Sequence, residues 1–510
     1  MTSSTPPSGS SPTAPRSGLS VEVNALNTIG EDERTGRPRG LFWPWFAANV
    51  SVFGLSYGSF LLGFGISFWQ AVLVGCVGIV ASFLLCGVIS LAGKRGSAPT
   101  MVLSRAIFGI NGNRLPSVLS WLLTVGWETV LTALAVLATS SVLTRLGWQG
   151  GASAKLIALV VVAGLIVLAG IVGFTLIMRL QMVITVVTGV LTGVYILLVL
   201  GHVHFAEVAA QPSGPAPAVI GGLVFMMTGY GLGWVNAAAD YSRYLPRSAR
   251  SSGVVGWTVF GSSIGPIVLL VFGLLLAGSS AQLNKDLAAD PVGALAALLP
   301  TWYLVPFALV AVLGMVGGAV LDIYSSGLAL LSSGLRAPRW VAAGIDGVLM
   351  TAGAIYVVFL ASDFLGPFQG FLITLGVPTA AWCGIFVADV LLRRTDYAER
   401  DLYDPNGRYG NVRWLPIALV GVGTVLGWGL VTNTYAGWLG WQGYLLEAVG
   451  LGGRQGSWAS ANLGVLVALV VGFLGTWVLG RSAVRTQEAL PVDAPASPGA
   501  ATGPAAGSPA

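Results

Sequence analysis

Two carboxyl groups stand within long apolar stretches of this chain. Glu128 lies in SWLLTVGWETVLTALA, and Asp322 lies in GMVGGAVLDIYSSGLALL. If these stretches cross a lipid bilayer, a bare charge at that depth costs at least ~2.5 kcal/mol, so each acid needs a partner or a function. Burial favours the neutral form of a carboxyl group, which can then hold and release a proton. Both residues are candidates for proton coupling. The alternative is a structural acid that bonds to a neighbour such as Thr124 or Thr132.

Two tryptophans accompany these acids at positions that suit ring stacking. Trp127 immediately precedes Glu128, and Trp234 ends the glycine-rich segment TGYGLGW. Stacking of a flat heterocycle on an aromatic side chain contributes ~1–3 kcal/mol per base in nucleic-acid complexes. We expect the polar edge of such a ring to be read by Asn49, Glu128 and Asp322 in one cavity. For each tryptophan taken alone, packing between helices is the alternative.

The composition places these residues in a membrane. Of 510 residues, 55% are hydrophobic and only 9% are charged, against roughly a quarter charged in an ordinary soluble domain. A helix of ~20 apolar residues spans the hydrocarbon core. We therefore predict an all-α polytopic membrane protein with twelve transmembrane helices, at residues 41–64, 69–92, 117–143, 156–176, 180–201, 219–240, 253–278, 302–334, 339–361, 366–391, 414–432 and 459–479.

The first and sixth of these helices carry small residues near their middles. Gly54 lies in the first, and Gly231 and Gly233 lie in the sixth. Unwound backbone at the midplane can bind a polar solute, although glycines also serve close helix packing. Matched interruptions five helices apart indicate a five-plus-five inverted repeat, because a five-helix unit re-enters the membrane from the opposite side. The two halves and the C-terminal addition are predicted at 41–201, 219–392 and 414–480.

Both chain ends are rich in Ser, Pro, Ala and Gly. We predict disordered tails at residues 1–40 and 481–510, and we expect transport to survive deletion of 1–18 or 490–510. The start shows no pattern of a cleaved signal peptide. Of the 25 Lys and Arg residues, 21 fall on the same side as the termini, which predicts cytoplasmic termini in a cell membrane. The net charge of +5 is thus a topology signal and does not indicate nucleic-acid binding.

Other acids stand near the predicted cytoplasmic ends of helices. Asp240 and Asp389 end helices 6 and 10, close to Arg243 and Arg393 respectively. Ion pairing or gating contacts are expected there, because these acids lie at the membrane edge. Asp346, a few residues into helix 9, could pair with Arg336 or Arg339.

Metal sites and enzyme chemistry find little support in the sequence. Cys76, Cys86 and Cys383 fall in apolar spans without the spacing of metal ligands, and free cysteines are usually buried packing residues. His202 and His204 alone do not make a metal site. The sequence has no metal-spaced histidine pair, no Cys/His dyad and no nucleotide-binding loop. We predict no enzyme activity, no cofactor and no bound metal.

Two segments are distinctive in composition. They are GKRGSAPTMVLSRAIFGINGNRLPSVL at 93–119 and WVNAAADYSRYLP at 234–246. Both resemble the nucleobase:cation symporter family, the permeases for cytosine, purines, uracil, thiamine, allantoin and related rings. ERTGRPRGLFWPWFAAN, DIYSSGL and IFVADVLLRR support the resemblance. It implies alternating access and uptake of a ring substrate driven by a Na⁺ or H⁺ gradient.

The resemblance also implies roles for particular residues. Trp127 and Trp234 fall where the family sandwiches the ring, and the helix 1 break near Phe53 and Gly54 lines the site, as does Asp322. Family members often carry an amide one turn after the helix 3 tryptophan, where this chain has Leu131. We therefore expect recognition of the ring edge to move to Glu128 or Asp322.

A second difference from the family concerns the coupling ion. Na⁺-coupled members place a hydroxyl pair in helix 8, where this chain has Gly317 and Gly318, which favours protons. Ser325 and Ser326 keep Na⁺ open. We predict a secondary active importer of a nucleobase, with cytosine or a purine favoured, by proton symport. The alternatives are a Na⁺-coupled carrier, a carrier of hydroxymethylpyrimidine, allantoin or uracil, and a passive channel.

Overall fold

A computed structural model describes residues 26–148, 150–172, 174–361, 363–433 and 437–490. Every regular element in these ranges is helical. The long runs of apolar residues form helices because a helix satisfies all of its backbone hydrogen bonds within one segment. Residues 1–25 and 491–510 of the two predicted tails lie outside the described residues.

Ten helices of the described part are long and apolar enough to cross a membrane. They are α3 (Phe68–Gly96), α6 (Arg114–Arg145), α7 (Gly151–Val172), α8 (Phe174–Val199), α10 with α11 (Ala216–Gly229, Gly231–Trp234), α12 (Ser251–Gly278), α15 (Leu304–Ser332), α16 (Arg339–Ile355), α17 (Leu365–Leu392) and α19 with α20 (Gly464–Gly475, Arg481–Ala489).

The remaining apolar helices are shorter. A bent pair, α1 (Phe42–Asn49) with α2 (Phe53–Leu62), makes an eleventh candidate span, and the shorter apolar helix α18 (Trp414–Trp428) occupies the eleventh predicted position. The all-helical membrane fold is confirmed, and these elements are consistent with the twelve predicted spans. Short helices fill the connections: α4 (Thr100–Leu103), α5 (Arg105–Phe108), α9 (Phe205–Ala209), α13 (Ala281–Ala289) and α14 (Pro291–Ala297).

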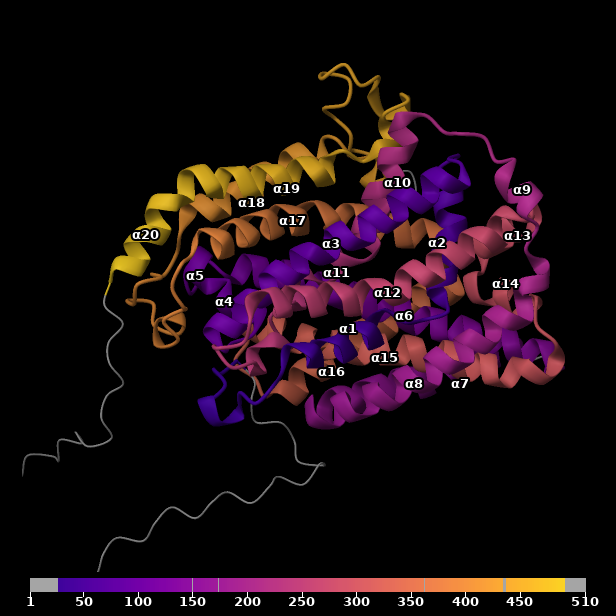
Figure 1. Cartoon of the computed structure of the whole chain (residues 1–510), viewed down its shortest axis with the longest axis horizontal. Helices are drawn as coiled ribbons and strands as arrows, with labels where there is room; N and C mark the ends of the chain where they lie inside the picture. Colours follow the sequence, from indigo (N-terminus) through magenta and orange to yellow (C-terminus); the bar gives the residue numbers. More distant parts are fainter. Residues whose placement is uncertain (1–25, 149, 173, 362, 434–436, 491–510) are drawn as a thin grey trace, which may run out of the picture.

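The packing of the long helices relates the two halves of the chain. Helices α6 and α15 pack along each other, as do α3 and α12 (Figure 1). Helices α1 and α2 pack on α12, while α10 and α11 pack on α3. Exchanging the halves would map predicted helices 1, 2 and 3 onto 6, 7 and 8. The pairs α6–α15 and α3–α12 then map onto themselves, and the contacts of α1 and α2 on α12 map onto those of α10 and α11 on α3. The arrangement is consistent with the predicted inverted repeat.

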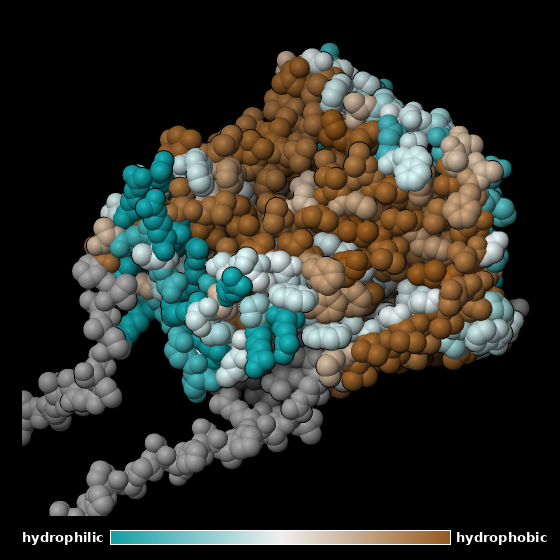
Figure 2. Space-filling view, viewed as in Figure 1, coloured by the Kyte–Doolittle hydropathy of each residue, from teal (hydrophilic) through white to brown (hydrophobic). Residues whose placement is uncertain are grey.

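The surface divides into an apolar band and a hydrophilic end. Figure 2 shows apolar residues over the middle of the molecule and hydrophilic residues at both ends, with the larger group at the end where α4, α5 and α20 lie in Figure 1. Large apolar side chains such as Val160, Val190 and Val348 are exposed on the band, as lipid contact requires. The hydrophilic end carries Arg34 and Arg247, and we call it the basic end.

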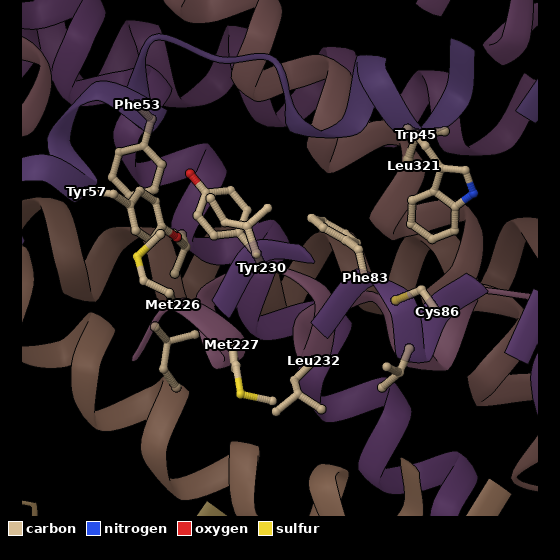
Figure 3. Close-up of a cluster of buried hydrophobic side chains, with 14 of the residues drawn as sticks. Trp45, Phe53, Tyr57, Phe83, Cys86, Met226, Met227, Tyr230, Leu232 and Leu321 are labelled. Atoms are coloured by element: carbon tan, nitrogen blue, oxygen red, sulfur yellow. The ribbon is translucent and has the colours of Figure 1, made fainter. Parts of the chain in front are cut away.

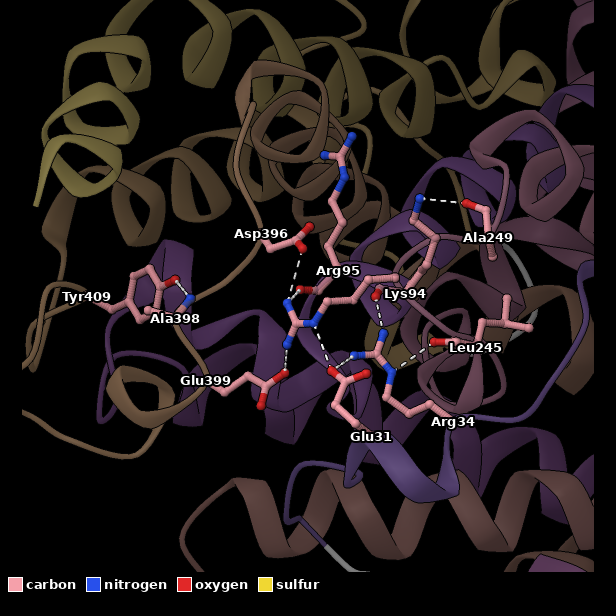
Figure 4. A network of polar contacts seen from close by, with 11 residues as sticks. Glu31, Arg34, Lys94, Arg95, Leu245, Ala249, Asp396, Ala398, Glu399 and Tyr409 are labelled. Atoms are coloured by element: carbon pink, nitrogen blue, oxygen red, sulfur yellow. Dashed lines mark hydrogen bonds and ion pairs between the residues drawn. The ribbon is translucent and has the colours of Figure 1, made fainter. Parts of the chain in front are cut away.

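The N-terminal segment is ordered at the basic end. Arg34 is only 3% exposed, and its guanidinium donates to the backbone carbonyls of Leu245 at 2.9 Å and Lys94 at 2.6 Å (Figure 4). The prediction that residues 1–40 are disordered is therefore wrong for residues 26–40. Backbone bonds from Ile29 to the Ser97 carbonyl at 2.8 Å and from Gly36 to the Tyr244 carbonyl at 3.1 Å also hold this segment. Composition does not reveal these partners, because they come from distant parts of the chain.

A second arginine joins several segments at the same end. Arg247 donates to Glu31 at 3.0 Å, to Asp396 at 3.1 Å and also to Glu399, and to the carbonyl of Arg95 at 3.2 Å. In Figure 4 these contacts connect the N-terminal segment, the end of α3 and the segment after α17.

The predicted C-terminal tail is also partly ordered. Residues Arg481–Ala489 continue the last span as α20. Gln487 accepts a hydrogen bond from Arg393 at 2.9 Å and donates to the carbonyl of Ala106 at 2.9 Å. The prediction of disorder over 481–510 is thus wrong for α20, because a buried amide ties this helix to α17 and α5.

Candidate functional site

The break in the first predicted helix is present. Helix α1 ends at Asn49, Val50 is extended with φ −94° and ψ 92°, and α2 begins at Phe53 after a bend of 66°. The amide nitrogen of Asn49 donates to the carbonyl of Trp45 at 2.9 Å. The side-chain amide of Asn49 thus bonds to a carbonyl within its own helix.

The break in the sixth helix lies within TGYGLGW. Tyr230, with φ −124° and ψ −106°, separates α10 from α11. The amide of Gly231 donates to the Ser82 hydroxyl at 3.1 Å, and its carbonyl accepts from the Cys86 thiol at 3.2 Å. The Gly229 carbonyl accepts from the neighbouring α2 at 3.2 Å. Protein side chains, rather than a solute, therefore satisfy these freed backbone groups.

Two of the predicted site glycines are packing residues. A Cβ on Gly231 would lie 2.2 Å from the backbone carbon of Ser82, so only a glycine lets α11 approach α3 this closely. A Cβ on Gly54 would lie 3.0 Å from the side chain of Leu269 on α12. The structure therefore turns both glycines toward neighbouring helices.

Tyr230 is a residue of the break that our sequence analysis missed. Its ring lies 4.7 Å from the ring of Tyr57 and 6.3 Å from that of Phe83, centroid to centroid. Figure 3 shows it among these rings and near Phe53. Its buried hydroxyl has no hydrogen-bond partner in the described structure. The signal was a tyrosine at the centre of a glycine-rich break.

Trp127 lies against the third glycine of the break. A Cβ on Gly233 would stand 2.7 Å from the indole nitrogen of Trp127, so the missing side chain makes room for the indole. The ring contacts Phe368 and Phe371 edge to face, at centroid distances of 5.6 and 5.9 Å. The buried indole N–H has no partner in the described structure. It is an available hydrogen-bond donor.

Trp234 is the one residue between Val224 and Arg243 that is not fully buried. Its ring meets that of Trp45 edge to face at 6.1 Å. A partly exposed ring within an otherwise buried run borders space that the protein does not fill. Trp127 is also partly buried, and its contact with Gly233 places the two predicted stacking residues beside one turn of backbone.

Asp322 lies on the face of α15 that meets the helix 1 break. One turn before it, a Cβ on Gly318 would lie 2.9 Å from Leu131 and 3.8 Å from the Ala48 carbonyl. Asp322 is 1% exposed, and its Oδ2 has no hydrogen-bond partner in the described structure. It is close enough to Tyr241, beyond the helix 6 break, to act on it electrostatically. Asp322 therefore belongs to the centre of the fold.

The side chain of Glu128 points away from that of Trp127. It is fully buried, neither carboxyl oxygen has a hydrogen-bond partner in the described structure, and its polar neighbours are Ser326 and Asp346. The alternative, a bond to a threonine, is not found among the described residues: Thr124 donates to a carbonyl of its own helix at 2.9 Å, and the Thr132 hydroxyl has no hydrogen-bond partner there. Neighbouring residues of a helix point about 100° apart. We had predicted that Glu128 and Trp127 line the same cavity. Glu128 instead has surroundings different from those of Trp127.

Glu128 and Asp322 nevertheless occupy one electrostatic environment. Asp346 and Asp322 both lie in the buried region around Glu128. The predicted pair of carboxyls is therefore part of a group of three within the helical bundle.

Asp346 has partners other than the expected arginines. Its Oδ1 accepts from the indole N–H of Trp121 at 2.6 Å, and its Oδ2 accepts from the Ser326 hydroxyl at 2.7 Å. Arg339 instead lies 4.4 Å from the ring of Tyr324. The expected pairing with an arginine is wrong, because two neutral donors already satisfy both carboxyl oxygens.

Asp240 fixes the turn that follows the helix 6 break. One oxygen accepts from the amide and the hydroxyl of Thr100, each at 2.8 Å, and the other accepts from Ser325 at 2.9 Å. Arg243 is fully buried and donates to the hydroxyl of Tyr324 at 2.7 Å. Both residues therefore tie the DYSRY turn to α4 and α15.

Asp389 forms an ion pair with Arg393. The two oxygens of the carboxylate accept from Nε and Nη2 of the guanidinium at 3.0 and 2.9 Å. Both side chains are buried, at 2% and 3% exposed. This bidentate pair holds the end of α17.

Two cavities approach helix 6 from opposite ends. One of about 300 Å³ opens at the basic end and is lined by Leu41, Pro44, Tyr241 and Tyr244, among others. The other, of about 230 Å³, is lined by Phe225, Thr228, Gln369 and Arg454, among others. The break and Trp234 lie in the segment between Thr228 and Tyr241.

Comparison with known proteins identifies the family. Residues 28–450 match the family described as permease for cytosine/purines, uracil, thiamine, allantoin. The chain belongs to this family. It is 24% identical over 410 residues to YxlA of Bacillus subtilis (strain 168), a protein assigned as a purine-cytosine permease, covering 78% of this chain and 85% of that one. It is 26% identical over 285 residues to the purine-cytosine permease FCY21 of Saccharomyces cerevisiae, covering 52% of this chain and 49% of that one.

Solved structures agree with the fold. Mhp1, a nucleobase-cation-symport-1 family transporter, has a TM-score of 0.67 in a closed conformation with bromovinylhydantoin bound, at 18% identity over 93% of this chain and 97% of that one. Its inward-facing conformation has a TM-score of 0.66. The family predicted from the sequence is confirmed. This protein is therefore a multi-pass membrane permease of the nucleobase:cation symporter family and not an enzyme.

Proposed function

We propose that this permease imports a nucleobase or a closely related ring, with cytosine or a purine favoured, by proton symport across the cell membrane. The observation that carries the proposal is the position of Trp127 and Trp234 beside Gly233, just after the helix 6 break. Alternating access requires a central site that can open to either side.

The side chains around this glycine suit a flat polar ring. Two indoles offer apolar faces, and the free N–H of Trp127 offers a donor. Asp322 offers an unpaired carboxyl oxygen on the same side of α15 as the helix 1 break. Few, well-placed polar groups among aromatic side chains are typical of small-molecule sites. Asp322 would bond to the N–H groups on the edge of the ring.

The polar groups of α15 favour protons over Na⁺. Gly318 faces the carbonyl of Ala48 without a side-chain oxygen. The two hydroxyls that left Na⁺ open each donate their hydrogen to a carboxyl group, Ser325 to Asp240 and Ser326 to Asp346. A Na⁺ site needs several oxygen ligands that face one ion, whereas a buried carboxyl can carry a proton alone.

In the proposed orientation in the membrane, both termini lie in the cytoplasm. The positively charged residues of the sequence gather on the side of the termini, and positive residues favour the cytoplasmic side. The basic end would then face the cytoplasm, and the cavity beside Tyr241 would be the inner one.

Uptake of radiolabelled rings tests the proposal. Cells that express the protein should accumulate cytosine or a purine, and a protonophore should abolish the accumulation. Trp127→Ala and Trp234→Ala should each lower uptake by about tenfold, because stacking contributes ~1–3 kcal/mol. Trp69→Ala is the matched control, since this tryptophan is 72% exposed on the apolar surface. Equal uptake by all three variants would contradict the stacking site.

The same assay distinguishes the alternatives. Preference for hydroxymethylpyrimidine, allantoin or uracil in a competition panel would correct the substrate. Accumulation that follows an imposed Na⁺ gradient would identify Na⁺, in place of H⁺, as the coupling ion. Equilibration without accumulation would indicate a passive channel.

A further inference from the structure

A buried polar cluster lies beside the proposed substrate site, where α6, α15 and α16 meet. It consists of Glu128, Ser326, Asp346 and Trp121, and the first three are 0% exposed. We propose that Glu128, Ser326 and Asp346 form a proton relay, in which the serine hydroxyl passes a proton between the two carboxyls. The inference rests on the proposed proton symport and assigns the residues that would carry the proton.

The hydroxyl of Ser326 is suited to a relay. It has one hydrogen, which it donates to Oδ2 of Asp346 at 2.7 Å, so its oxygen remains free to accept. Glu128 lies beside this hydroxyl and has no hydrogen bond in the described structure. A neutral Glu128 can donate its proton to the Ser326 oxygen as Ser326 passes its own hydrogen to Asp346. One O–H bond forms and one breaks at the serine, and no other reactant is needed.

The two ends of the relay differ in a way that gives it a direction. Asp346 accepts two hydrogen bonds, from Trp121 and Ser326, and bonds of this kind favour the ionised form of a carboxyl group. Glu128 accepts none, and complete burial favours its neutral form. The arrangement therefore corresponds to a proton on Glu128 and an ionised Asp346 able to receive it.

The surroundings of the cluster contain one further acid and one base. The further acid is Asp322 of α15, which lies in the same buried region as Glu128. On α16, Arg339 stands over Tyr324 and donates to the Gly170 carbonyl at 3.2 Å. Helix α7 meets α16 through an apolar contact, in which Val167 would touch a Cβ on the residue after Asp346. Three carboxyls in one buried region do not all ionise together, so the cluster retains a proton.

The geometry also links the relay to the ring site. Asp322 is the carboxyl proposed to bond to the substrate, and its charge acts on Glu128. A ring that donates hydrogen bonds to Asp322 stabilises its ionised form, which in turn makes Glu128 hold its proton more tightly. Substrate and proton would then bind together, as symport requires.

The relay runs toward the basic end of the protein. Glu128 lies 14 residues after the start of α6, and Asp346 lies 7 residues after the start of α16. Both helices start on the side where α15 ends and contacts α4. Fewer residues separate Asp346 from the start of its helix, so its backbone lies nearer to that side than the backbone of Glu128. The relay therefore carries a proton from mid-bundle toward the proposed cytoplasmic face.

Two measurements on reconstituted vesicles test the relay. The first is accumulation of the labelled ring under an imposed pH gradient, and the second is counterflow, the exchange of internal for external ring without a gradient. We expect Glu128→Gln, Asp346→Asn and Ser326→Ala to lose accumulation by at least about tenfold, since a positioned proton carrier contributes about 10²–10⁴-fold in enzymes. Counterflow should persist in all three variants.

The control variants separate relay chemistry from packing. Ser326→Thr keeps the hydroxyl and should restore accumulation that Ser326→Ala loses. Asp286→Asn removes an exposed acid on α13 and should behave as the unmodified protein. Loss of counterflow together with accumulation in Ser326→Ala and Asp346→Asn would show a structural role and overturn the relay.

The remaining outcomes keep the two proposals distinct. Unchanged accumulation in Asp346→Asn overturns the relay and leaves the proposed ring transport intact. Accumulation driven only by a Na⁺ gradient in the unmodified protein also overturns the relay but retains the ring substrate. An unmodified protein that moves no ring at all overturns the proposed function itself.

Discussion

The substitution Gly233→Ala tests the ring site directly. A Cβ at this position would stand 2.7 Å from the indole nitrogen of Trp127, whereas ordinary contact begins near 3.4 Å. The indole must therefore move by roughly 0.7 Å or more, which is enough to tilt it away from a stacked ring. The backbone of α11 is not itself in conflict with the new methyl group.

The expected effect is a loss of substrate affinity with little loss of stability. Stacking on one aromatic face contributes ~1–3 kcal/mol, and a displaced indole would lose part of this. A loss of about 1–2 kcal/mol corresponds to a Kd that rises roughly 5- to 30-fold. Alanine also favours helix over glycine by about 1 kcal/mol, which offsets the strain of moving a side chain.

Two other glycines provide the comparison. Gly231→Ala would place a methyl group 2.2 Å from the backbone of α3, which cannot move as a side chain can. It should lower stability by about 1–3 kcal/mol. Gly256→Ala, on α12, has nothing within 4 Å of the new atom and should change neither property. Ring binding by fluorescence titration and thermal unfolding in detergent measure the two effects separately.

The reasoning fails in two recognisable ways. Equal Kd values for Gly233→Ala and the unmodified protein, with Trp127→Ala defective, would mean that the indole moves without cost. Equal Kd values for all of these variants would mean that the ring binds elsewhere.

Two further predictions concern the basic end. Asp389→Asn leaves the buried guanidinium of Arg393 without its counter-ion, and we expect the free energy of unfolding to fall by about 3–5 kcal/mol; an unchanged thermal midpoint in detergent would contradict the pairing. Arg247→Ala should cost about 1 kcal/mol at pH 7, because its partner Glu31 is largely exposed. The hydrogen bond from Arg247 lowers the pKa of Glu31 below its ordinary value of 4.5. This contribution is present above pH 4.5 and is lost as Glu31 becomes protonated, so unfolding measured below that pH should show a smaller difference between variant and unmodified protein.

The sequence predicted the membrane fold and the helix breaks well, for a simple physical reason. A helix needs a run of about 20 apolar residues to cross a bilayer. Such runs can be located in the sequence without knowing which helices pack against one another. Small residues in the middle of such a span are conspicuous, and the structure places the break at Tyr230 between two of the glycines. The contacts of Gly231 with α3 show that one glycine serves packing, which the spacing alone left open.

The direction of each side chain was harder to predict. Glu128 and Trp127 are neighbours in sequence, and we expected both to line one cavity. On a helix they diverge by about 100°, and the structure sends Trp127 to Gly233 and Glu128 to Ser326. Helices that are apolar on every side carry no pattern that fixes their rotation, so the partners of a buried acid depend on tertiary packing.

The same limit explains the ordered parts of the tails. Their composition predicts disorder, yet Arg34 and Gln487 each bond to backbone carbonyls far away in sequence. A few buried polar side chains can help to order a segment that is poor in apolar residues, because leaving their partners unsatisfied would be costly. Composition averages over such residues.

Divergence of Trp127 and Glu128 on one helix is also what a coupled carrier needs. A proton site that shared the surface of the ring site would be displaced or neutralised by each polar ring. Here the proposed ring contact and the proposed proton site stand on two faces of α6, joined by one peptide unit, while Asp322 of α15 acts on Glu128 electrostatically. A shift of α6 against α15 would therefore change both sites at once, so binding at one face alters the energy at the other without a shared ligand.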